Sequence, residues 1–230
     1  MNIPIVILCG GLGTRISKIT NKIPKSLVKI NGKPFLEYQI KLLKQNNFKT
    51  INLCIGYKGK LIINYLKSKN NFNVEVRYSS DGKFNLGTGG ALKKMLKKMN
   101  TEYFFLTYGD SYLPEDYNKI KKQFIKKKSK NIMCIYKNNN KYDKSNIMIK
   151  NSLIISYNKN NQNSDFIDYG LSIINRNEFL KFAENFDKFD VSSYFKYLIK
   201  KKKLNYIRVY KRFYEIGSYS GIKSLSKIMN

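Results

Sequence analysis

Near its N-terminus the chain reads Ile3-Pro4-Ile5-Val6-Ile7-Leu8-Cys9-Gly10-Gly11-Leu12-Gly13-Thr14-Arg15, and Pro24-Lys25-Ser26-Leu27 follows. The apolar run Ile3 to Leu8 predicts a buried strand. The glycine-rich turn after it exposes backbone N–H groups without side chains to block approach, which suits a polyphosphate. Arg15 adds a planar fork for phosphate oxygens, and Lys25 adds a movable point charge. These features predict a phosphate-binding loop at the carboxyl end of the first strand.

Two common phosphate-binding loops do not fit these letters. A Walker A loop needs Gly-x-x-x-x-Gly-Lys-Ser/Thr, and no Gly-Lys pair stands at that spacing from Gly10, Gly11 or Gly13. A dinucleotide fingerprint needs Gly-x-Gly-x-x-Gly, and Ile16 stands where the third glycine belongs. The loop is therefore of another kind.

The loop and the segments after it resemble the signature of the sugar-phosphate nucleotidyltransferases. The likeness is closest to the guanylyltransferases that act on heptose 1-phosphate or mannose 1-phosphate. The signature Gly-Gly-x-Gly-Thr-Arg, Pro-Lys-x-Leu and Gly-Lys-Pro occurs in order at Gly10–Arg15, Pro24–Leu27 and Gly32–Pro34. A glycine turn that only joins a strand to a helix is the alternative, but it needs neither Arg15 nor Lys25. The resemblance implies nucleotide binding by Leu8, Gly10, Gly11, Gly13, Thr14, Arg15 and Lys25.

Apolar runs alternate with amphipathic segments through the first 136 residues, which predicts a mostly parallel sheet with helices on both faces. The expected strands are Ile3–Leu8, Ile51–Ile55, Val74–Tyr78, Tyr103–Thr107 and Ile132–Tyr136. The expected helices are Phe35–Gln45, Lys60–Lys67, Gly90–Lys98 and Tyr117–Lys126. With the resemblance, the fold class is α/β: a Rossmann-like three-layer α/β/α arrangement with a mostly parallel mixed sheet, as in GT-A-like nucleotide-diphospho-sugar transferases.

The pattern changes after residue 136. A hairpin is expected around Asn151-Ser152, followed by mixed strands and a lid. The strands of the hairpin are Asn146–Lys150 and Leu153–Tyr157. The further elements expected are strands Ile167–Asn175 and Leu204–Tyr210, and helices Glu178–Phe186, Val191–Lys200 and Tyr219–Ile228. No long Pro/Gly/Ser linker divides the chain, so we expect one domain over residues 1–230. Residues 1–136 would form the nucleotide-binding core, and residues 137–230 the sugar-binding and lid part.

Composition narrows the classes of function. The 230 residues include no histidine, which excludes histidine-based triads and imidazole acids or bases. Any metal would be held by carboxylates, which favours magnesium or manganese. Cys9, Cys54 and Cys134 stand in separate apolar runs and are expected to be buried free thiols of a reducing compartment, here the cytoplasm. No membrane span is expected, because the apolar runs have only strand length. No signal peptide is expected either, because no basic region precedes Ile3 to Leu8.

The net charge of +29 raises the alternative of a nucleic-acid-binding protein. The runs Lys126–Lys128 and Lys200–Lys203 adjoin apolar-periodic segments without interleaved aromatics, which favours solvated helix faces and turns. We therefore expect no nucleic-acid partner. A diffuse positive field would still attract anionic substrates.

A second glycine-rich turn reads Leu86-Gly87-Thr88-Gly89-Gly90-Ala91 and stands between a strand and a helix. It resembles the turn that lies against the nucleobase in the family, which implies nucleotide binding by Gly87, Thr88 and Gly89. The alternative is a helix start with Thr88 as its cap.

Carboxylates follow two further strands. Gly109-Asp110 ends the strand Tyr103–Thr107 and matches the family's Gly-Asp, whose aspartate ligates magnesium; a turn cap is the alternative. Glu215 stands where the family has a second ligating aspartate, one methylene shorter. The resemblance thus implies Mg²⁺ as cofactor with Asp110 and Glu215 as ligands, and Gly109 among the nucleotide-binding residues.

The sugar-phosphate side is expected in the second half of the chain. Lys159 in Tyr157-Asn158-Lys159 resembles the lysine of the family's Glu-Lys-Pro, with asparagines as neighbours. Asp168 and Gly170 stand where the family has a small-residue turn under the sugar ring. Asp168 would accept sugar hydroxyls or cap a bulge, and both interpretations remain open.

Together these residues suit attack by a sugar-1-phosphate oxygen on the α-phosphorus of a nucleoside triphosphate, with GTP favoured. Arg15, Lys25 and Asp110 would carry the chemistry through charge, because the attacking phosphate is already an anion. The product would be a nucleotide sugar for surface polysaccharide synthesis. A cytidylyltransferase of the same fold with a phosphorylated amine or amino acid as acceptor, and a non-catalytic nucleotide-binding regulator, are the alternatives. These motifs do not specify base, acceptor or oligomeric state, with a homodimer as one option.

Overall fold

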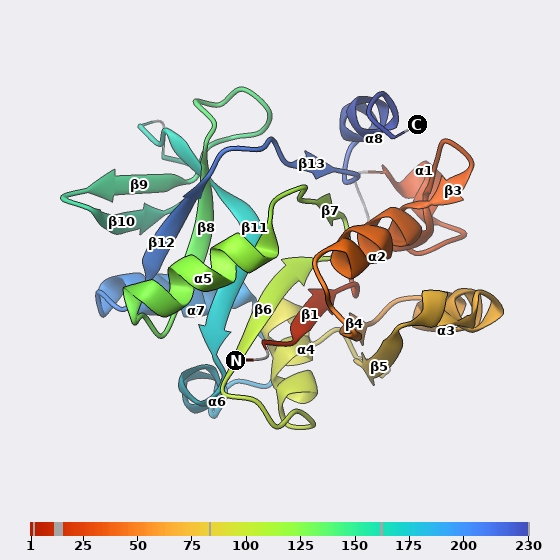
Figure 1. The fold of residues 1–230 in the computed structure, drawn as a ribbon, viewed down its shortest axis with the longest axis horizontal. Helices are drawn as coiled ribbons and strands as arrows, with labels where there is room; N and C mark the ends of the chain where they lie inside the picture. The colour runs from red at the N-terminus through yellow and green to blue at the C-terminus, as the bar shows by residue number, and fades with distance from the viewer. Residues whose placement is uncertain (2, 12–15, 83, 162, 230) are drawn as a thin grey trace.

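The computed structural model describes residues 1, 3–11, 16–82, 84–161 and 163–229. Within these residues a mixed central β-sheet has nine strands (Figure 1). Seven of them lie in the order β10-β9-β11-β6-β1-β4-β5, while β8 pairs with β11 and β12 pairs with β8. The strands are β1 Ile5–Leu8, β4 Thr50–Ile55, β5 Glu75–Ser80, β6 Tyr103–Tyr108, β8 Ile132–Lys137, β9 Ile147–Lys150, β10 Leu153–Tyr157, β11 Phe166–Asn175 and β12 Asn205–Val209.

Strand β1 lies between β4 and β6 and is parallel to both. Leu8 pairs with Cys54 of β4 and with Tyr108 of β6. Because parallel strands present their carboxyl ends at the same edge of a sheet, the turns after β1, β4 and β6 meet there.

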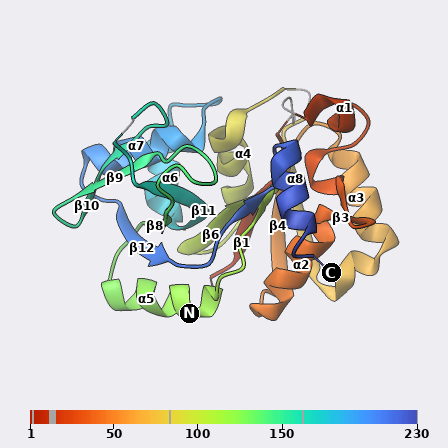
Figure 2. The ribbon, with the colours of Figure 1, turned by 90° about the horizontal axis from the view of Figure 1, so that it is seen from above.

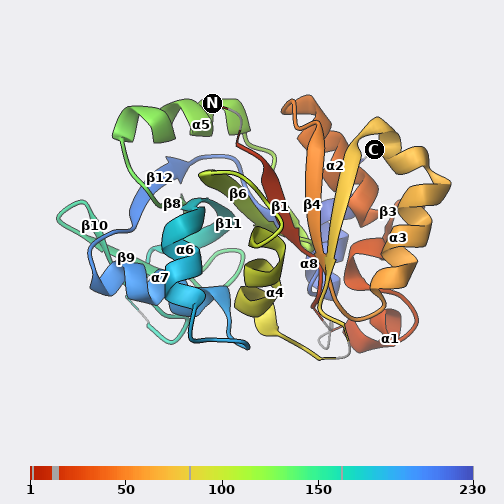
Figure 3. The same cartoon turned by 90° about the horizontal axis from the view of Figure 1, so that it is seen from below.

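Helices cover both faces of the sheet (Figures 2 and 3). Ile5 and Ile7 of β1 face one side and pack with α2 (Phe35–Gln45), α3 (Gly59–Ser68) and α5 (Tyr117–Lys127). Val6 and Leu8 face the other side and pack with α4 (Gly87–Leu96), α6 (Arg176–Ala183) and α7 (Val191–Lys200). The side chains of β1 thus point alternately to the two faces, as the period of two in a strand requires. A sheet covered by helices on both faces confirms the three-layer α/β/α fold predicted from the sequence.

The second half of the chain extends the same sheet with antiparallel strands. β11 pairs antiparallel with both β6 and β8. β9 and β10 form the predicted hairpin, in which Asn151 and Ser152 adopt φ of 50° and 60°. Asparagine tolerates this left-handed conformation better than most residues, which explains its place in the turn.

Several short elements were not predicted, because two to four residues carry no periodic signal. They are α1 Ser17–Thr20, η2 Lys25–Leu27, η3 Asn70–Asn73, β2 Lys29–Ile30, β3 Lys33–Pro34, β7 Ser111–Tyr112 and β13 Tyr214–Glu215. β2 pairs with β3, and β13 pairs with β7. A third apolar cluster, with Phe35 and Ile216 fully buried, joins β2, β7 and β13 to α8 (Tyr219–Ser226).

Two helix boundaries differ clearly from the prediction. α4 begins at Gly87, three residues before the expected start, because a neighbouring loop holds its glycines in the first turn. α6 spans Arg176–Ala183 rather than Glu178–Phe186, since the Asn175 side chain accepts the backbone N–H of Glu178 at 2.9 Å and caps the helix earlier. None of the helices in the described ranges combines the length and hydropathy needed to cross a membrane.

Candidate nucleotide site

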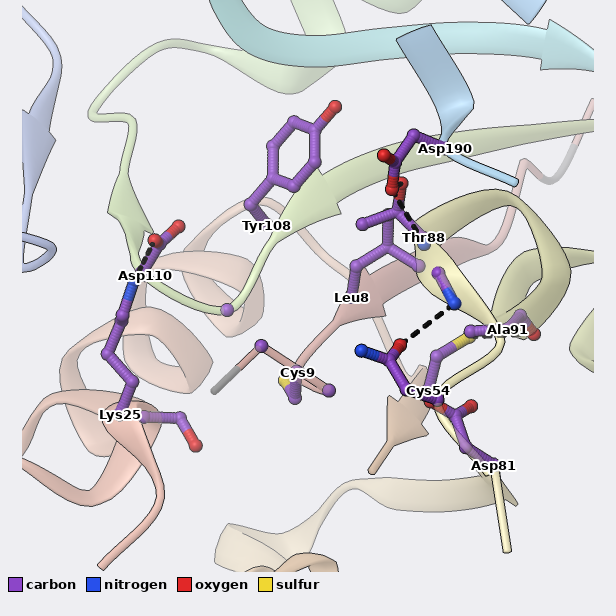
Figure 4. Close-up of a pocket in the computed structure, with 16 residues that line it drawn as sticks. Leu8, Cys9, Lys25, Cys54, Asp81, Thr88, Ala91, Tyr108, Asp110 and Asp190 are labelled. Carbon is purple, nitrogen blue, oxygen red and sulfur yellow. Dashed lines mark hydrogen bonds and ion pairs between the residues drawn. The ribbon is translucent and has the colours of Figure 1, made fainter. Parts of the chain in front are cut away.

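A cavity of about 390 Å³ opens at the carboxyl ends of β1, β4 and β6 (Figure 4). Four segments that the sequence analysis selected contribute to it: the loop after β1, the lysine of η2, the turn that opens α4 and Gly109-Asp110 after β6. Its lining residues are Leu8, Cys9, Gly10, Gly11, Lys25, Ser26, Cys54, Asp81, Asn85, Gly87, Thr88, Ala91, Tyr108, Gly109, Asp110 and Asp190. The expected Gly13, Thr14 and Arg15 lie outside the described residues.

At one end of the cavity the Lys25 Nζ lies 2.9 Å from the Asp110 Oδ2 (Figure 4). Both side chains are largely buried, with 16% and 29% exposed. The Gln39 Nε2 donates to the carbonyls of Tyr108 and Ser111 at 2.8 and 3.0 Å, so the chain is anchored on both sides of Asp110. No sequence pattern indicates Gln39, because its role depends on how α2 packs against the end of β6.

Gly109 lets this chain segment pass close to the first loop. Its N–H donates to the Leu8 carbonyl at 2.9 Å. A Cβ atom on Gly109 would lie 2.5 Å from the Cys9 Sγ, which no real side chain tolerates. Burial, with a further contribution from the Asp110 charge, raises the pKa of Cys9 to about 12. Cys9, Cys54 and Cys134 are all buried and free, as expected of their apolar runs.

One side of the second glycine-rich turn lines the cavity, and the other side packs against the loop before α7. Gly87 and Thr88 line the cavity, whereas Gly89 is buried behind them. The Gly89 N–H donates to the Phe189 carbonyl at 2.8 Å, and a Cβ on Gly89 would overlap the Phe189 ring. A Cβ on Gly90 would lie 2.5 Å from the Asp187 carbonyl oxygen. Gly89 and Gly90 therefore serve the packing of the loop before α7, whereas Gly87 and Thr88 line the cavity.

Replacing Gly89 by alanine is expected to lower the free energy of unfolding by about 1–3 kcal/mol. The Phe189 ring cannot withdraw easily, because it packs on Phe179 and Phe182 with centroids 6.0 and 5.8 Å apart. The higher helix propensity of alanine offsets this loss of stability by at most about 1 kcal/mol. Urea unfolding measures the loss, and Gly11→Ala is the control, since a Cβ on Gly11 meets no atom of the described residues within 4 Å. Equal stability of the two variants would contradict the packing argument.

Asp190 is a cavity residue that sequence reasoning missed. Its Oδ1 accepts the Thr88 hydroxyl at 3.2 Å, and the Thr88 Oγ1 in turn accepts the Val191 N–H at 2.9 Å. Thr88 therefore helps to start α7 and not its own helix. Nothing in the local sequence indicates this contact, because the residues stand far apart in the chain.

The backbone of the Glu215 segment lies beside that of Asp110. β13 pairs with β7, and the Ile216 N–H donates to the Asp110 carbonyl at 3.0 Å. The Glu215 carboxylate, however, accepts hydrogen bonds from the Gly217 N–H and the Ser218 hydroxyl. Ser218 is the N-cap of α8, so the carboxylate supports the start of this helix. Within the described residues no cluster of three or more acidic, cysteine or histidine side chains is placed to hold a metal ion.

The expected sugar-phosphate residues do not line the cavity. Lys159 is exposed, and its Nζ lies 3.8 Å from the Asp143 Oδ2. The Asp168 carboxylate accepts the Gly170 N–H at 2.9 Å and the Tyr157 hydroxyl at 3.1 Å, at a register shift of β11 against β8. Burial raises the pKa of Asp168. The geometry thus shows Asp168 in the bulge-capping role that the sequence left as one of two interpretations.

Comparison with known proteins agrees with this geometry. The sequence pattern of the nucleotidyl transferase family matches residues 5–146. The chain belongs to this family. The matched range contains the glycine loop, the Lys25–Asp110 pair and the turn that opens α4, so the resemblance seen in the sequence is confirmed.

Among curated relatives, a D-glycero-α-D-manno-heptose 1-phosphate guanylyltransferase of Campylobacter jejuni is 41% identical over 116 residues, which are 50% of this chain and 51% of that protein. The corresponding protein of Aneurinibacillus thermoaerophilus is 32% identical over 120 residues, or 52% and 51% of the two chains. The chain thus spans about half the length of the curated relatives it matches.

Solved structures extend the likeness over the whole fold. HddC from Yersinia pseudotuberculosis, complexed with GMP-PN, has a TM-score of 0.84 at 26% identity and covers 100% of both chains. The inositol-1-phosphate CTP transferase of T. maritima has a TM-score of 0.81 at 18% identity over 98% and 94% of the chains, which shows a shared fold alone.

Proposed function

We propose that the protein transfers a nucleotidyl group from a nucleoside triphosphate, with GTP favoured, to the phosphate of a sugar 1-phosphate. A phosphate oxygen of the sugar attacks the α-phosphorus, the bond from the α-phosphorus to the bridging oxygen breaks, and pyrophosphate leaves with that electron pair. The observation that carries the proposal is the Lys25–Asp110 pair beside a glycine loop at the end of β1. No general base is needed, because the nucleophile is already ionised; this suits a chain without histidine.

The chain's own residues would act by position and charge. The loop amides from Gly10 onward, with Arg15, would hold the triphosphate. Lys25 would leave Asp110 for the α- and β-phosphates and the departing pyrophosphate. Lys159 would hold the sugar phosphate, for which it must exchange Asp143 for the substrate. Gly87 and Thr88 would lie against the nucleoside.

Asp110 fits a magnesium ion. It is a partly exposed carboxylate that lines the cavity and already holds a cation, the Lys25 ammonium, at 2.9 Å. Mg²⁺ is commonly bound by one or two carboxylates together with substrate phosphates, so Asp110 suffices as the protein anchor. Glu215 would join as a second ligand only by releasing Gly217 and Ser218. When bound, the ion would neutralise charge on the reacting phosphates.

The relatives support GTP and a heptose- or mannose-type acceptor. The first two curated relatives are heptose 1-phosphate guanylyltransferases, mannose-1-phosphate guanyltransferases stand among the others beside uridylyl- and cytidylyltransferases, and the HddC structure holds GMP-PN. We extend the proposal to a cytoplasmic enzyme that supplies nucleotide sugar for surface polysaccharide and has no nucleic-acid or membrane partner.

Pyrophosphate release tests the function directly. GTP, CTP, UTP and dTTP are each combined with Mg²⁺ and a panel of sugar 1-phosphates and phosphorylated amines. Release with GTP and one sugar 1-phosphate is the expected result. Release only with CTP and a phosphorylated amine would identify the cytidylyltransferase alternative, and binding of a nucleotide without any release would identify a non-catalytic regulator.

Replacing Glu215 by alanine is expected to lower the free energy of unfolding by about 0.5–2 kcal/mol, because Gly217 and Ser218 lose their acceptor at the start of α8. Thermal unfolding of the magnesium-free protein measures this loss. A magnesium titration of turnover in the same variant separates the two roles. A raised half-saturating concentration supports ligation by Glu215, whereas an unchanged one restricts this residue to the helix start.

A further inference from the structure

Asp81 is an acidic residue of the cavity that neither the phosphate chemistry nor the packing uses. Its N–H donates to the Ile55 carbonyl at 2.9 Å and so prolongs the pairing of β5 with β4. Its carboxylate lies against two glycines: a Cβ atom on Gly56 would lie 3.0 Å from the Asp81 Oδ2, and one on Gly10 would lie 3.3 Å away. Glycines at both positions leave room for the carboxylate beside the nucleotide loop.

Within the described part of the chain the Asp81 carboxylate has neither a hydrogen bond nor an ion pair. It is nevertheless half-buried. Burial raises the pKa of Asp81, and the charge of Lys94 opposes this only in part. A carboxylate that is withdrawn from water without a partner costs free energy, and in a cavity such a cost indicates a ligand that supplies the missing donors.

Asn85 lines the same cavity and presents the complementary group. Its Oδ1 accepts the Gly87 N–H at 2.9 Å, so the amide nitrogen is left as a donor. Asp81 and Asn85 both belong to the segment between β5 and α4. Together they offer an amide NH₂ group that donates and a carboxylate whose two oxygens accept hydrogen bonds.

The cavity has two chemically different ends. Figure 4 shows the Lys25–Asp110 pair on one side and Asp81, with Thr88 and Ala91, on the other. If the phosphates lie at the cationic end with Lys25, the base of the nucleotide reaches the end with Asp81.

We propose that Asp81 and Asn85 select guanine by its Watson–Crick edge: the Asp81 carboxylate accepts from N1–H and from the 2-amino group, and the Asn85 amide donates to O6. This assignment rests on the proposed nucleotidyl transfer for the placement of the phosphates. Guanine alone among the common bases presents two adjacent donors on this edge. Uracil and thymine place carbonyl oxygens on both sides of a single donor, cytosine places two acceptors beside its amino group, and adenine has one amino group beside an acceptor nitrogen. Each of these leaves an acceptor opposite the carboxylate.

Calorimetric binding with Mg²⁺ tests the assignment, using GTP, ITP, ATP, CTP and UTP. ITP is guanosine triphosphate without the 2-amino group, so it removes one of the two donors. We expect the wild-type protein to bind GTP about 10-fold more tightly than ITP, and Asp81→Asn to weaken GTP binding by about 10–100-fold and erase the difference from ITP. The control is Asp165→Asn, the same chemical change at an exposed site outside the cavity, which should keep the wild-type pattern.

The outcomes are distinct. Equal wild-type affinity for GTP and ITP, a preference for a pyrimidine nucleotide, or an unchanged GTP–ITP difference in Asp81→Asn would each overturn the assignment. The GTP–ITP comparison uses the wild-type protein, so it tests the assignment even if the Asp81→Asn variant fails to fold. Selective GTP binding that Asp81→Asn abolishes, without pyrophosphate release by the wild type, would overturn the proposed transfer and leave guanine selection standing.

Discussion

Replacing Asp110 by asparagine is expected to lower kcat for pyrophosphate release by about 10²–10³. The substitution removes the negative charge that holds Lys25 at 2.9 Å and that would anchor the magnesium ion. The fold should survive, because the backbone bond from the Ile216 N–H to the Asp110 carbonyl and the Gln39 bonds on either side do not involve the carboxylate. Steady-state turnover at saturating substrates measures the effect, with thermal unfolding as the check on folding.

The same change at Asp165 serves as the control for Asp110→Asn. Asp165 is exposed and lies outside the cavity, so Asp165→Asn should turn over at the wild-type rate. A kcat of Asp110→Asn within about threefold of the wild type would remove this carboxylate from the proposed chemistry. Magnesium dependence adds a second readout, since the variant should need more Mg²⁺ for half-maximal GTP binding even where turnover is too slow to follow.

What the sequence predicts well is what neighbouring residues determine. The run Ile3 to Leu8 leads into a glycine turn, and the structure has a strand over Ile5–Leu8 that ends at the cavity. Helix Val191–Lys200 follows the expected bounds, because its apolar spacing is unbroken. Asp110 comes just after a strand in the chain, so its place at the carboxyl edge of the sheet could also be predicted.

What the sequence could not show depends on contacts between distant segments. Gly89 looked like part of a base-binding turn, but its missing side chain makes room for Phe189, a hundred positions along the chain. Glu215 matched a metal ligand by position, while its carboxylate bonds to Gly217 and Ser218. Asp81 stands in no motif, and the parallel pairing of β1 with β4 and of β4 with β5 brings it beside Gly10.

Replacing Lys25 by alanine is expected to lower kcat by about 10²–10³ as well, for a different reason. The ammonium is the one described cation that lines the cavity, where it would stabilise the charge that develops on the departing pyrophosphate. Lys29→Ala is the matched control, because Lys29 is exposed in β2 and does not line the cavity. Near-normal turnover of Lys25→Ala would contradict the proposed role.

A double-mutant cycle with Lys25→Ala and Asp110→Asn separates chemistry from simple pairing. If the two residues only neutralise each other, either single change leaves an unpaired, largely buried charge. The double variant should then be more active and more stable than either single variant. If each acts on the substrate, the double variant stays at least as slow as the slower single variant. We expect the second result for kcat, because the reaction requires the pair to separate, and the first for stability, because the two charges pair at 2.9 Å in the structure. The double variant should therefore be more stable than either single variant and yet turn over no faster than the slower of them. Neither a purely structural nor a purely catalytic role of the pair would produce both results.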